Sequence, residues 1–260
     1  MDVYVNFIKK HKTAGIKVDS QLKDKVVLLT GAGGGIGRAA AEKLAACGMK
    51  IVLFGGNNLE KLKQTQEIVE KYSECLTIPG DLTDPDFISD GVQKAVDGFG
   101  YIDVLINNAG VAQNTAFEDI SLAEFDKIMA INVRVPFMLT QQLLPYLKKS
   151  GSATIINIAS VVSHAGYPQQ SIYTASKHAL LGMTKSLARE YYKENIRVHA
   201  IAPGGVYTDM VKISRPDLTP DGMIMPSDIA DIIYFFLANR SNAVIDEIIV
   251  HRVNKEPFQV

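Results

Sequence analysis

Short apolar runs alternate with longer segments of helical periodicity almost to the end of this chain, and this alternation constrains its fold most. Each run suits a strand buried on both faces, and each intervening segment suits a covering helix. The pattern predicts an α/β fold with a doubly wound parallel sheet and helices on both faces. Strands are expected at 26–29, 51–54, 76–78, 102–106, 153–158, 197–201 and 244–250, and helices at 35–47, 58–72, 84–98, 121–149, 173–193 and 226–238.

A glycine-rich turn joins the first expected strand to the first expected helix. Residues 30–37 are Thr-Gly-Ala-Gly-Gly-Gly-Ile-Gly, and an alanine-rich segment follows them. Glycines allow the backbone to approach a pyrophosphate closely, and the helix N-terminus offers unpaired N–H groups to its charges. The order of strand, glycine turn and helix therefore predicts a Rossmann-type dinucleotide cradle, with a plain tight turn as the alternative.

Tyr173 and Lys177 are four residues apart in a segment expected to be helical. This spacing places both side chains on one helix face. A phenol is a weak acid near neutrality, but an ammonium beside it favours the phenolate and makes proton transfer easier. The same spacing also occurs in ordinary surface pairs, so the glycine turn is needed to favour a catalytic interpretation.

Polar residues and turn residues follow the next four expected strands. Asp81 and Leu82 follow the third, residues 107–110 the fourth, Ser160 the fifth, and Pro203 with Gly204 the sixth. In open parallel sheets ligands bind beyond these strand ends. Each position also has a structural alternative: Asp81 could cap a helix, Asn108 could serve a turn, and the Pro-Gly pair could simply end a strand.

Composition favours one large domain and excludes several classes of function. The chain has 260 residues, 47% of them hydrophobic, and no linker-like stretch. A formal net charge of −1 without a long basic run argues against nucleic acid or an anionic membrane as a partner. Cys47 and Cys75 are expected to be thiols of a cytoplasmic protein. Residues 1–20 are expected to form an N-terminal extension before a catalytic domain at 21–260, and no metal site is expected.

Together these motifs resemble the short-chain dehydrogenase/reductase family, in its shorter single-domain branch. The resemblance extends over about residues 22–250, and Ser160 and Tyr173 have the family's familiar separation of 13 residues. The matching elements are residues 30–37 (TGxxxGxG), Asp81, residues 107–110 (NNAG), Asn132, Ser160, Tyr173 with Lys177 (YxxxK), Pro203 with Gly204, and Thr208 after Val206.

The resemblance implies a nicotinamide-dependent oxidoreductase that interconverts a carbonyl and a secondary alcohol. Tyr173 would transfer the proton, Lys177 would lower the pKa of Tyr173 and hold the nicotinamide ribose, and Ser160 would hold the substrate oxygen. Asn132 would join the proton relay by positioning a water molecule. From the residues alone, Asn132 is equally consistent with a polar side chain on a helix facing solvent.

The resemblance also implies a set of cofactor-binding residues. They are Gly31, Gly33, Gly35, Ile36 and Gly37 at the pyrophosphate, Asp81 and Leu82 at the adenine, Asn108 and Gly110 at the ribose, Asn57 after the second strand, Pro203, Gly204 and Val206 after the sixth, Thr208 at the carboxamide, and Tyr173 with Lys177.

The second strand lacks the residues by which this family usually distinguishes its two cofactors. Gly55 and Gly56 stand where an acid would favour NAD or an arginine would favour NADP. Without a carboxylate nothing repels a 2′-phosphate, and Asn57, Asn58 or Lys61 could hydrogen-bond it. The expected cofactor is therefore NADP, with NAD not excluded.

The substrate is left open by the sequence. The tail, residues 244–252, lacks the glycine-rich ending of the family's acyl-carrier-protein reductases, and a 3-oxoacyl or small hydroxy-acid compound is the expected class. Lys212 and Arg215 could anchor an anion, and residues 161–170 with His164 and Tyr167 should line the pocket. His164 has no nameable acid partner. The alternatives are a catalytically silent dinucleotide-binding regulator and a nucleotide-sugar epimerase-like enzyme, which normally has a larger C-terminal domain.

Two expected helices appear too apolar for a single buried face. They are 121–149 and 173–192, and the resemblance implies that they pair two subunits in a homodimer or homotetramer. The apolar residues concerned are Ile128, Met129, Val133, Phe137, Met138, Leu143, Leu180, Leu181, Met183 and Leu187.

Overall fold

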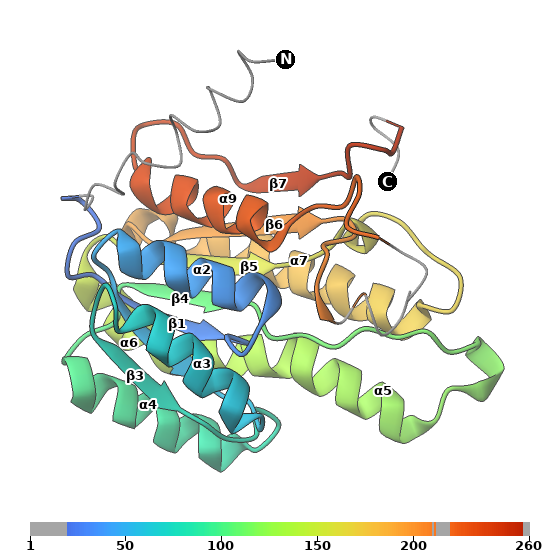
Figure 1. Ribbon diagram of the computed structural model, residues 1–260, viewed down its shortest axis with the longest axis horizontal. Coiled ribbons are helices and arrows are strands. Elements are labelled where there is room, and N and C mark those ends of the chain that lie inside the picture. The colour runs from blue at the N-terminus through green and yellow to red at the C-terminus, as the bar shows by residue number, and fades with distance from the viewer. Residues whose placement is uncertain (1–19, 210, 212–218, 257–260) are drawn as a thin grey trace.

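A seven-stranded parallel sheet forms the centre of the molecule (Figure 1). The structure is a computed structural model that describes residues 20–209, 211 and 219–256. The strand order is β3-β2-β1-β4-β5-β6-β7, so the order reverses between β1 and β4. The strands are β1 Val26–Thr30, β2 Lys50–Phe54, β3 Cys75–Ile78, β4 Val104–Asn107, β5 Thr154–Ile158, β6 Arg197–Pro203 and β7 Glu247–Val250. The predicted doubly wound Rossmann-type sheet is confirmed.

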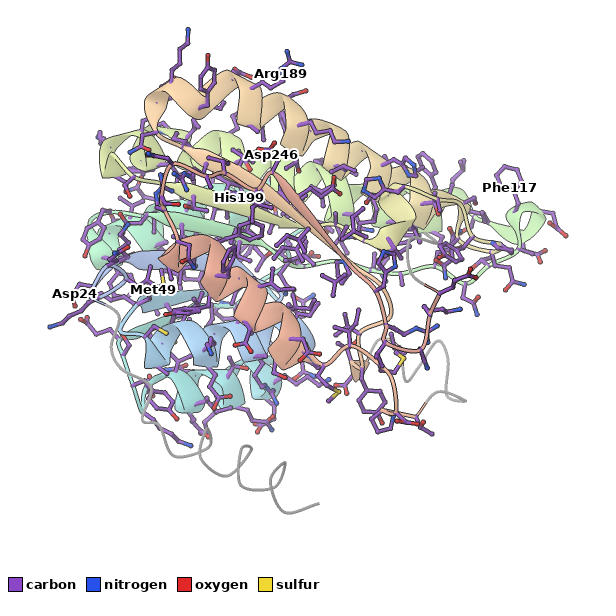
Figure 2. All side chains as sticks on the ribbon, turned by 90° about the horizontal axis from the view of Figure 1, so that it is seen from above. Asp24, Met49, Phe117, Arg189, His199 and Asp246 are labelled. Carbon is purple, nitrogen blue, oxygen red and sulfur yellow. The ribbon has the colours of Figure 1, made fainter. Side chains whose placement is uncertain are left out.

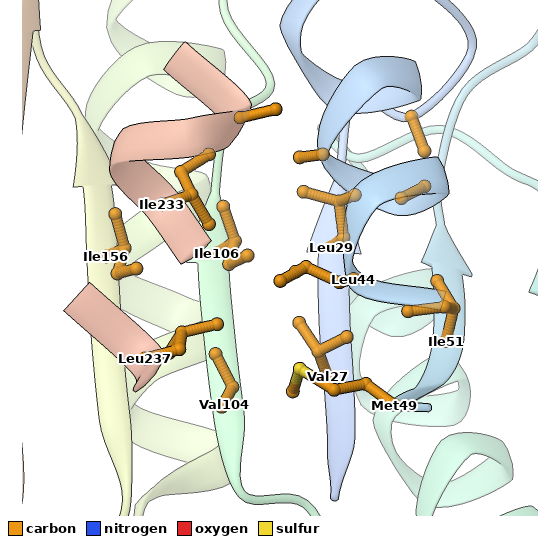
Figure 3. Close-up of a cluster of buried hydrophobic side chains, with 14 of the residues drawn as sticks. Val27, Leu29, Leu44, Met49, Ile51, Val104, Ile106, Ile156, Ile233 and Leu237 are labelled. Atoms are coloured by element: carbon orange, nitrogen blue, oxygen red, sulfur yellow. The ribbon is translucent and has the colours of Figure 1, made fainter. Parts of the chain in front are cut away.

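Alternate strand residues pack on opposite faces of this sheet. Val27 and Leu29 contact α2 and α9 on one face, as Figure 3 shows with Leu44 and Ile233, whereas Val26 and Leu28 face α4 and α6. This alternation follows from the two-residue period of a strand and explains why the runs are apolar throughout. The helices are α2 Gly35–Ala46, α3 Leu59–Val69, α4 Pro85–Phe99, α5 Leu122–Met129, α6 Val135–Ser150, α7 Ser171–Tyr191 and α9 Pro226–Ala238.

The two edge strands differ from the sequence prediction of burial on both faces. β3 has one fully buried residue and β7 has none, because each has a neighbouring strand on one side only. β7 also begins at Glu247 rather than at Val244. Elsewhere the boundaries shift by a few residues, as hydrogen bonding at element ends commonly requires.

The helix expected at 121–149 is interrupted. α5 and α6 are separated by one π-helical turn, Ala130–Arg134, which contains Asn132. Turns of this type widen the helix locally and often occur at functional sites. Nearby, the loop that carries Phe117 protrudes from one end of the molecule (Figure 2).

The predicted N-terminal extension, residues 1–20, lies outside the described residues except for Ser20. Across the part of the chain that the structure describes, none of the helices is both long enough and apolar enough to span a bilayer.

Candidate active site

A cleft of about 750 Å³ opens beyond the carboxyl ends of the central strands. Its walls come from the glycine turn, the ends of β4, β5 and β6, the first turns of α7, and the segment after β7. This is where a doubly wound sheet places its ligand, and the volume suits a small-molecule site. The predicted residues that line it are Gly31, Gly35, Ile36, Asn108, Gly110, Ser160, Tyr173, Lys177, Pro203, Gly204, Val206 and Thr208. Gly33, Gly37, Asn57, Asp81, Leu82 and Asn132 are not among its lining residues.

The glycine turn leaves the N-terminus of α2 open to the cleft. No side chain caps this end of the helix, and no acidic residue lies in its first turn. Its first backbone N–H groups can therefore donate to an anion, as a pyrophosphate site requires. Gly35 and Ile36 of this first turn line the cleft. The residues present thus fit a dinucleotide.

Gly37 and Asn108 both stabilise the glycine turn, although only Asn108 of the two lines the cleft. A Cβ on Gly37 would lie 2.3 Å from the carbonyl oxygen of Gly31, so only glycine fits there. Asn108 lines the cleft and donates from Nδ2 to the carbonyl oxygens of Thr30 at 2.9 Å and Gly31 at 3.2 Å. Both residues fix the loop geometry on which an anion site depends.

Lys177 is buried on α7, with 4% of its surface exposed. Its Nζ donates to the carbonyl oxygen of Ile158 at 2.7 Å and lies 5.9 Å from the centre of the Tyr173 ring. Burial lowers the pKa of this ammonium to about 8. The fold therefore holds a cation next to the candidate proton donor at an electrostatic cost.

Tyr173 shows the opposite tendency to the one the sequence suggested. Desolvation by burial raises the pKa of its phenol, and a hydrogen bond with Ser160 only partly opposes this. The ammonium of Lys177 donates to the Ile158 carbonyl rather than to the phenol. The phenol is thus kept protonated, which suits proton donation more than proton removal.

Ser160 stands at the end of β5, close to Tyr173. Its Oγ donates to the carbonyl oxygen of Pro203 at 3.4 Å and accepts from the N–H of Val162 at the same distance. The hydroxyl therefore lies between the fifth and sixth strand ends, where it also reaches the phenol of Tyr173. Ser160, Tyr173 and Lys177 are brought together as the sequence predicted.

Asn132 is completely buried in the π-helical turn, so the alternative of a side chain facing solvent is wrong. Its Oδ1 accepts from the N–H of Val111 at 2.9 Å, and its Nδ2 donates to the Val111 carbonyl and to Ser176 Oγ, each at 2.9 Å. Asn132 thus connects the chain after β4 to α7. A Cβ on Gly110 would lie 3.4 Å from Asn132 Oδ1 and 3.6 Å from Lys177 Nζ, so both groups border this glycine.

Asp81 does not cap the following helix, as one alternative expected, but stabilises the turn before it. Its Oδ1 accepts from the N–H and from Oγ1 of Thr83, each at 2.8 Å, and these bonds lower the pKa of the carboxyl. Asp81 therefore stabilises the turn before α4, whose own N-cap is Asp84.

The position that would select the cofactor is shaped for glycine. Gly55 has φ +76°, and a Cβ there would lie 2.4 Å from Cδ2 of Leu82. Neither the acid nor any other side chain fits without strain. Asn58, considered above for a 2′-phosphate, caps α3 instead, because its Oδ1 accepts from the N–H of Lys61 at 3.0 Å.

Lys61 reaches the cleft from α3 and forms an ion pair there. Its Nζ lies 2.8 Å from Oδ2 of Asp209, and both residues line the cleft. The two residues are 148 positions apart in the sequence, so no local pattern predicts this contact. The pair bridges the glycine-turn wall and the chain after β6.

The loop after β5 differs partly from expectation. Tyr167 lines the cleft, but His164 does not, and His164 has an acid partner after all: Nε2 lies 2.6 Å from Oε1 of Glu247 on β7. No motif indicates this pair, because His164 follows β5 and Glu247 begins β7, 83 residues later. Lys212 and Arg215, the other proposed anion anchors, lie outside the described residues.

Gln113 is a residue that sequence reasoning missed. It is buried, and its Oε1 accepts from the N–H groups of Ile172 at 2.8 Å and Tyr173 at 3.3 Å. Its amide oxygen thus satisfies free donors in the first turn of α7 from a loop after β4. No motif marks such a contact between segments distant in sequence.

The family model described as short chain dehydrogenase matches residues 25–219 of this chain. Among relatives, the chain is 37% identical over 212 residues to levodione reductase from Leifsonia aquatica, covering 80% of this chain and 79% of that protein. It is 34% identical over 242 residues to the 3-oxoacyl-[acyl-carrier-protein] reductase FabG from Thermotoga maritima, covering 88% and 96%. It is 36% identical over 195 residues to D-beta-hydroxybutyrate dehydrogenase from Rhizobium meliloti, covering 74% and 76%.

Solved structures share the fold. A metagenomic short-chain oxidoreductase in complex with NADP has a TM-score of 0.78 and 32% identity, covering 89% of this chain and 99% of that chain. A short chain dehydrogenase from Mycobacterium paratuberculosis bound to NAD has a TM-score of 0.79 and 28% identity, covering 89% and 97%.

Proposed function

Because this chain belongs to the short-chain dehydrogenase family, whose relatives are named as oxidoreductases acting on CH–OH groups, we propose that it interconverts a small carbonyl compound and its secondary alcohol. The proposal rests chiefly on one observation: Ser160, Tyr173 and Lys177 border the same cleft as the uncapped glycine turn. A proton donor, an orienting hydroxyl and a dinucleotide site at one edge of the sheet are the groups that such a reaction requires.

In the proposed reaction a nicotinamide cofactor, when bound, supplies the hydride. The substrate carbonyl carbon gains that hydride, and its oxygen gains the proton held at Oη of Tyr173. The raised pKa of the phenol keeps this proton in place until charge develops on the oxygen. Ser160 would hydrogen-bond the same oxygen and hold it within reach of the phenol, so that binding energy is spent on orientation.

The proposed cofactor is NADP, with NAD as a weaker ligand. Leu82 and a strained backbone keep a carboxylate away from position 55, so nothing there repels a 2′-phosphate. Lys61 is a cation beside the glycine turn that could bind a phosphate, but the phosphate would have to compete with Asp209. Discrimination should therefore be modest, on the order of tenfold. Titration of the fluorescence of NADPH and NADH measures it, and a preference for NADH above about a hundredfold would contradict the proposal.

The reaction is tested with a panel of ketones and alcohols, assayed with both cofactors at the reduced-nicotinamide absorbance. Consumption of cofactor that depends on a carbonyl supports the proposal. Cofactor binding without turnover of any compound would favour the silent regulator. Conversion of nucleotide sugars without net cofactor consumption would favour the epimerase-like alternative.

We also propose that two copies pair through α5, α6 and α7. Many apolar residues of these helices, including Ile128, Leu143 and Leu180, are buried within the subunit and need no partner. Phe125 and Phe137, however, are 39% and 50% exposed. A second copy covering them would give a homodimer or homotetramer with closed symmetry. Light scattering that finds a fully active 28.4 kDa monomer would refute this pairing.

A further inference from the structure

The segment after β7 turns into the cleft and brings basic side chains with it. His251, Arg252 and Lys255 all line the cleft, although no sequence motif includes them. His251 and Arg252 are partly buried, whereas Lys255 is exposed. The C-terminal segment therefore supplies a cationic part of the wall that the proposed reaction does not use.

Among the described residues, the guanidinium of Arg252 has one weak hydrogen-bond acceptor and no acidic partner. Its Nη1 donates to Sδ of Met223 at 3.3 Å, and a thioether is a weak acceptor. Over residues 20–209, 211 and 219–256, no carboxylate lies within ion-pair distance of this guanidinium. Within this part of the chain, the guanidinium lines the cleft with most of its hydrogen-bond donors unused.

The position of Arg252 relates it to the reacting end of the cleft. Its Cδ lies 3.5 Å from the place where a Cβ of Gly205 would stand. Two residues before Gly205, the carbonyl oxygen of Pro203 accepts the hydrogen bond from Ser160. The glycine turn, in contrast, meets this wall at Thr208, whose Cγ2 would lie 2.9 Å from a Cβ on Gly35. Arg252 therefore packs against the loop at Gly205, two residues from the acceptor of Ser160, whereas the glycine turn meets that loop at Thr208.

Charge in the cleft also favours an anion. The lining includes four cationic side chains (Lys61, Lys177, Arg252 and Lys255) and two carboxylates (Asp209 and Glu256). Asp209 is already paired with Lys61. A chain with a formal net charge of −1 thus presents a surplus of positive charge at this one site.

We propose that Arg252 binds the carboxylate of an anionic substrate, so that the enzyme acts on an oxo acid and the corresponding hydroxy acid. The carbonyl of that substrate would be held by Ser160 and Tyr173 while the guanidinium receives the carboxylate at the other end. A bidentate, charge-assisted pair of hydrogen bonds between the guanidinium and the carboxylate supplies both affinity and orientation. This inference rests on the proposed function and assigns its substrate class.

The first test compares each oxo acid with its neutral methyl ester. A series of 2-, 3-, 4- and 5-oxo acids is assayed for kcat/KM with wild type, Arg252→Met and Arg252→Lys. Wild type should prefer the acid for at least one chain length, and Arg252→Met should lower the acid-to-ester ratio by about tenfold or more. Arg252→Lys should give an intermediate ratio, because it keeps the charge but loses the fork.

Controls separate recognition from folding. Turnover of the ester by Arg252→Met shows that this variant is folded. Arg189→Met removes a cation from the outer side of α7, remote from the cleft, and should leave the ratio unchanged (Figure 2). An acid preference that survives in Arg252→Met, or no acid preference at any chain length, would overturn the inference.

The second test does not depend on turnover. Calorimetry compares butyrate with methyl butyrate, neither of which carries a reducible ketone, with and without saturating NADP⁺. Wild type should bind butyrate at least about fivefold more tightly, and Arg252→Met should lose that difference. Equal binding by wild type counts against the inference. If the butyrate result holds while no carbonyl is reduced, the proposed reaction fails and the anion site stands; if ketones are reduced without any effect of Arg252, the reverse is true.

Discussion

The two sides of the cleft are built differently. On the catalytic side, Tyr173 and Lys177 come from α7, Ser160 lies two residues beyond β5, and the buried Lys177 has a backbone partner at 2.7 Å. On the C-terminal side, loops after β6 and β7 supply partly exposed residues such as Arg252, which donates a hydrogen bond to a thioether. Regular elements thus fix the reacting groups, while loops present groups that can vary without disturbing them. The relatives named above, which share the fold but carry different substrates in their names, are consistent with such a division.

Removal of the proton donor should lower turnover more than any other substitution considered below. A small effect would contradict the distinction between the two sides of the cleft. Tyr173→Phe keeps the ring but loses the phenol proton, so turnover should fall by about 10²-fold or more with little change in cofactor affinity. Tyr167→Phe is the matched control, because Tyr167 lines the same cleft and is 42% exposed. Steady-state kinetics with the best substrate should show the control within about threefold of wild type. Similar losses in both variants would mean that the phenol of Tyr173 has no special role.

Lys177, on the catalytic side, should make stability depend on pH. Its folded-state pKa is lowered from 10.5 to about 8, so between these values the unfolded chain binds more protons than the folded one. The free energy of unfolding should therefore rise with pH over this window, by on the order of 3 kcal/mol. Urea unfolding of the cofactor-free protein at about pH 7.5 and about pH 10 measures the rise. Lys177→Met should remove most of this increase in the free energy of unfolding, whereas Arg252→Met should not. If Lys177→Met keeps the whole increase, burial does not lower the pKa of Lys177.

The cofactor end should resist redesign more than the substrate end. Gly55→Asp introduces the acid typical of NAD enzymes, but it strains a residue at φ +76° and collides with Leu82. We expect a loss of about 2 kcal/mol or more in the free energy of unfolding, measured in urea. In the double variant Gly55→Asp, Leu82→Ala, the share of the stability loss caused by the collision with Leu82 should disappear. The share caused by the backbone conformation should remain. A stable Gly55→Asp protein with strong NADH preference would contradict this account of the position.

Substitution of Gln113 tests whether the first turn of α7 depends on a hydrogen-bond acceptor from another segment. Gln113→Ala leaves the N–H groups of Ile172 and Tyr173 without their acceptor, so turnover should fall about tenfold while cofactor affinity changes little. Gln113→Glu keeps an acceptor and places a negative charge at a helix N-terminus, so its turnover should stay near that of wild type. Kinetics and cofactor titration on both variants decide the matter. A loss in Gln113→Glu equal to that in Gln113→Ala would show that the acceptor is not what matters.

The sequence predicted the parts of the molecule that depend on local pattern. The short, continuous apolar runs predicted the strands, and the glycine turn with the Tyr173 and Lys177 spacing predicted one wall of the cleft. The interruption at Ala130–Arg134 was not predicted, because its apolar pattern continues through α5 and α6. The exposure of β3 and β7 depends on strand order, which single runs do not encode.

Contacts between distant segments could not be predicted. The Gln113 oxygen and the N–H of Ile172 are 59 residues apart, His164 and Glu247 are 83 apart, and Lys61 and Asp209 are 148 apart. Each pair forms only after parallel strands bring their loops to one edge. The reversed pKa shift of Tyr173 has the same origin, since desolvation depends on the completed packing around the phenol.

Transfer of a labelled hydride tests the central claim most directly. The cofactor is prepared with two deuterium atoms at C4 of the reduced nicotinamide, and the alcohol formed from a ketone of the panel is analysed by mass spectrometry. We predict one deuterium on the carbinol carbon with wild type and far less labelled product with Tyr173→Phe in the same time. An unlabelled alcohol, or a cofactor that binds and is never oxidised by any carbonyl, would contradict the assignment of this cleft as a hydride-transfer site.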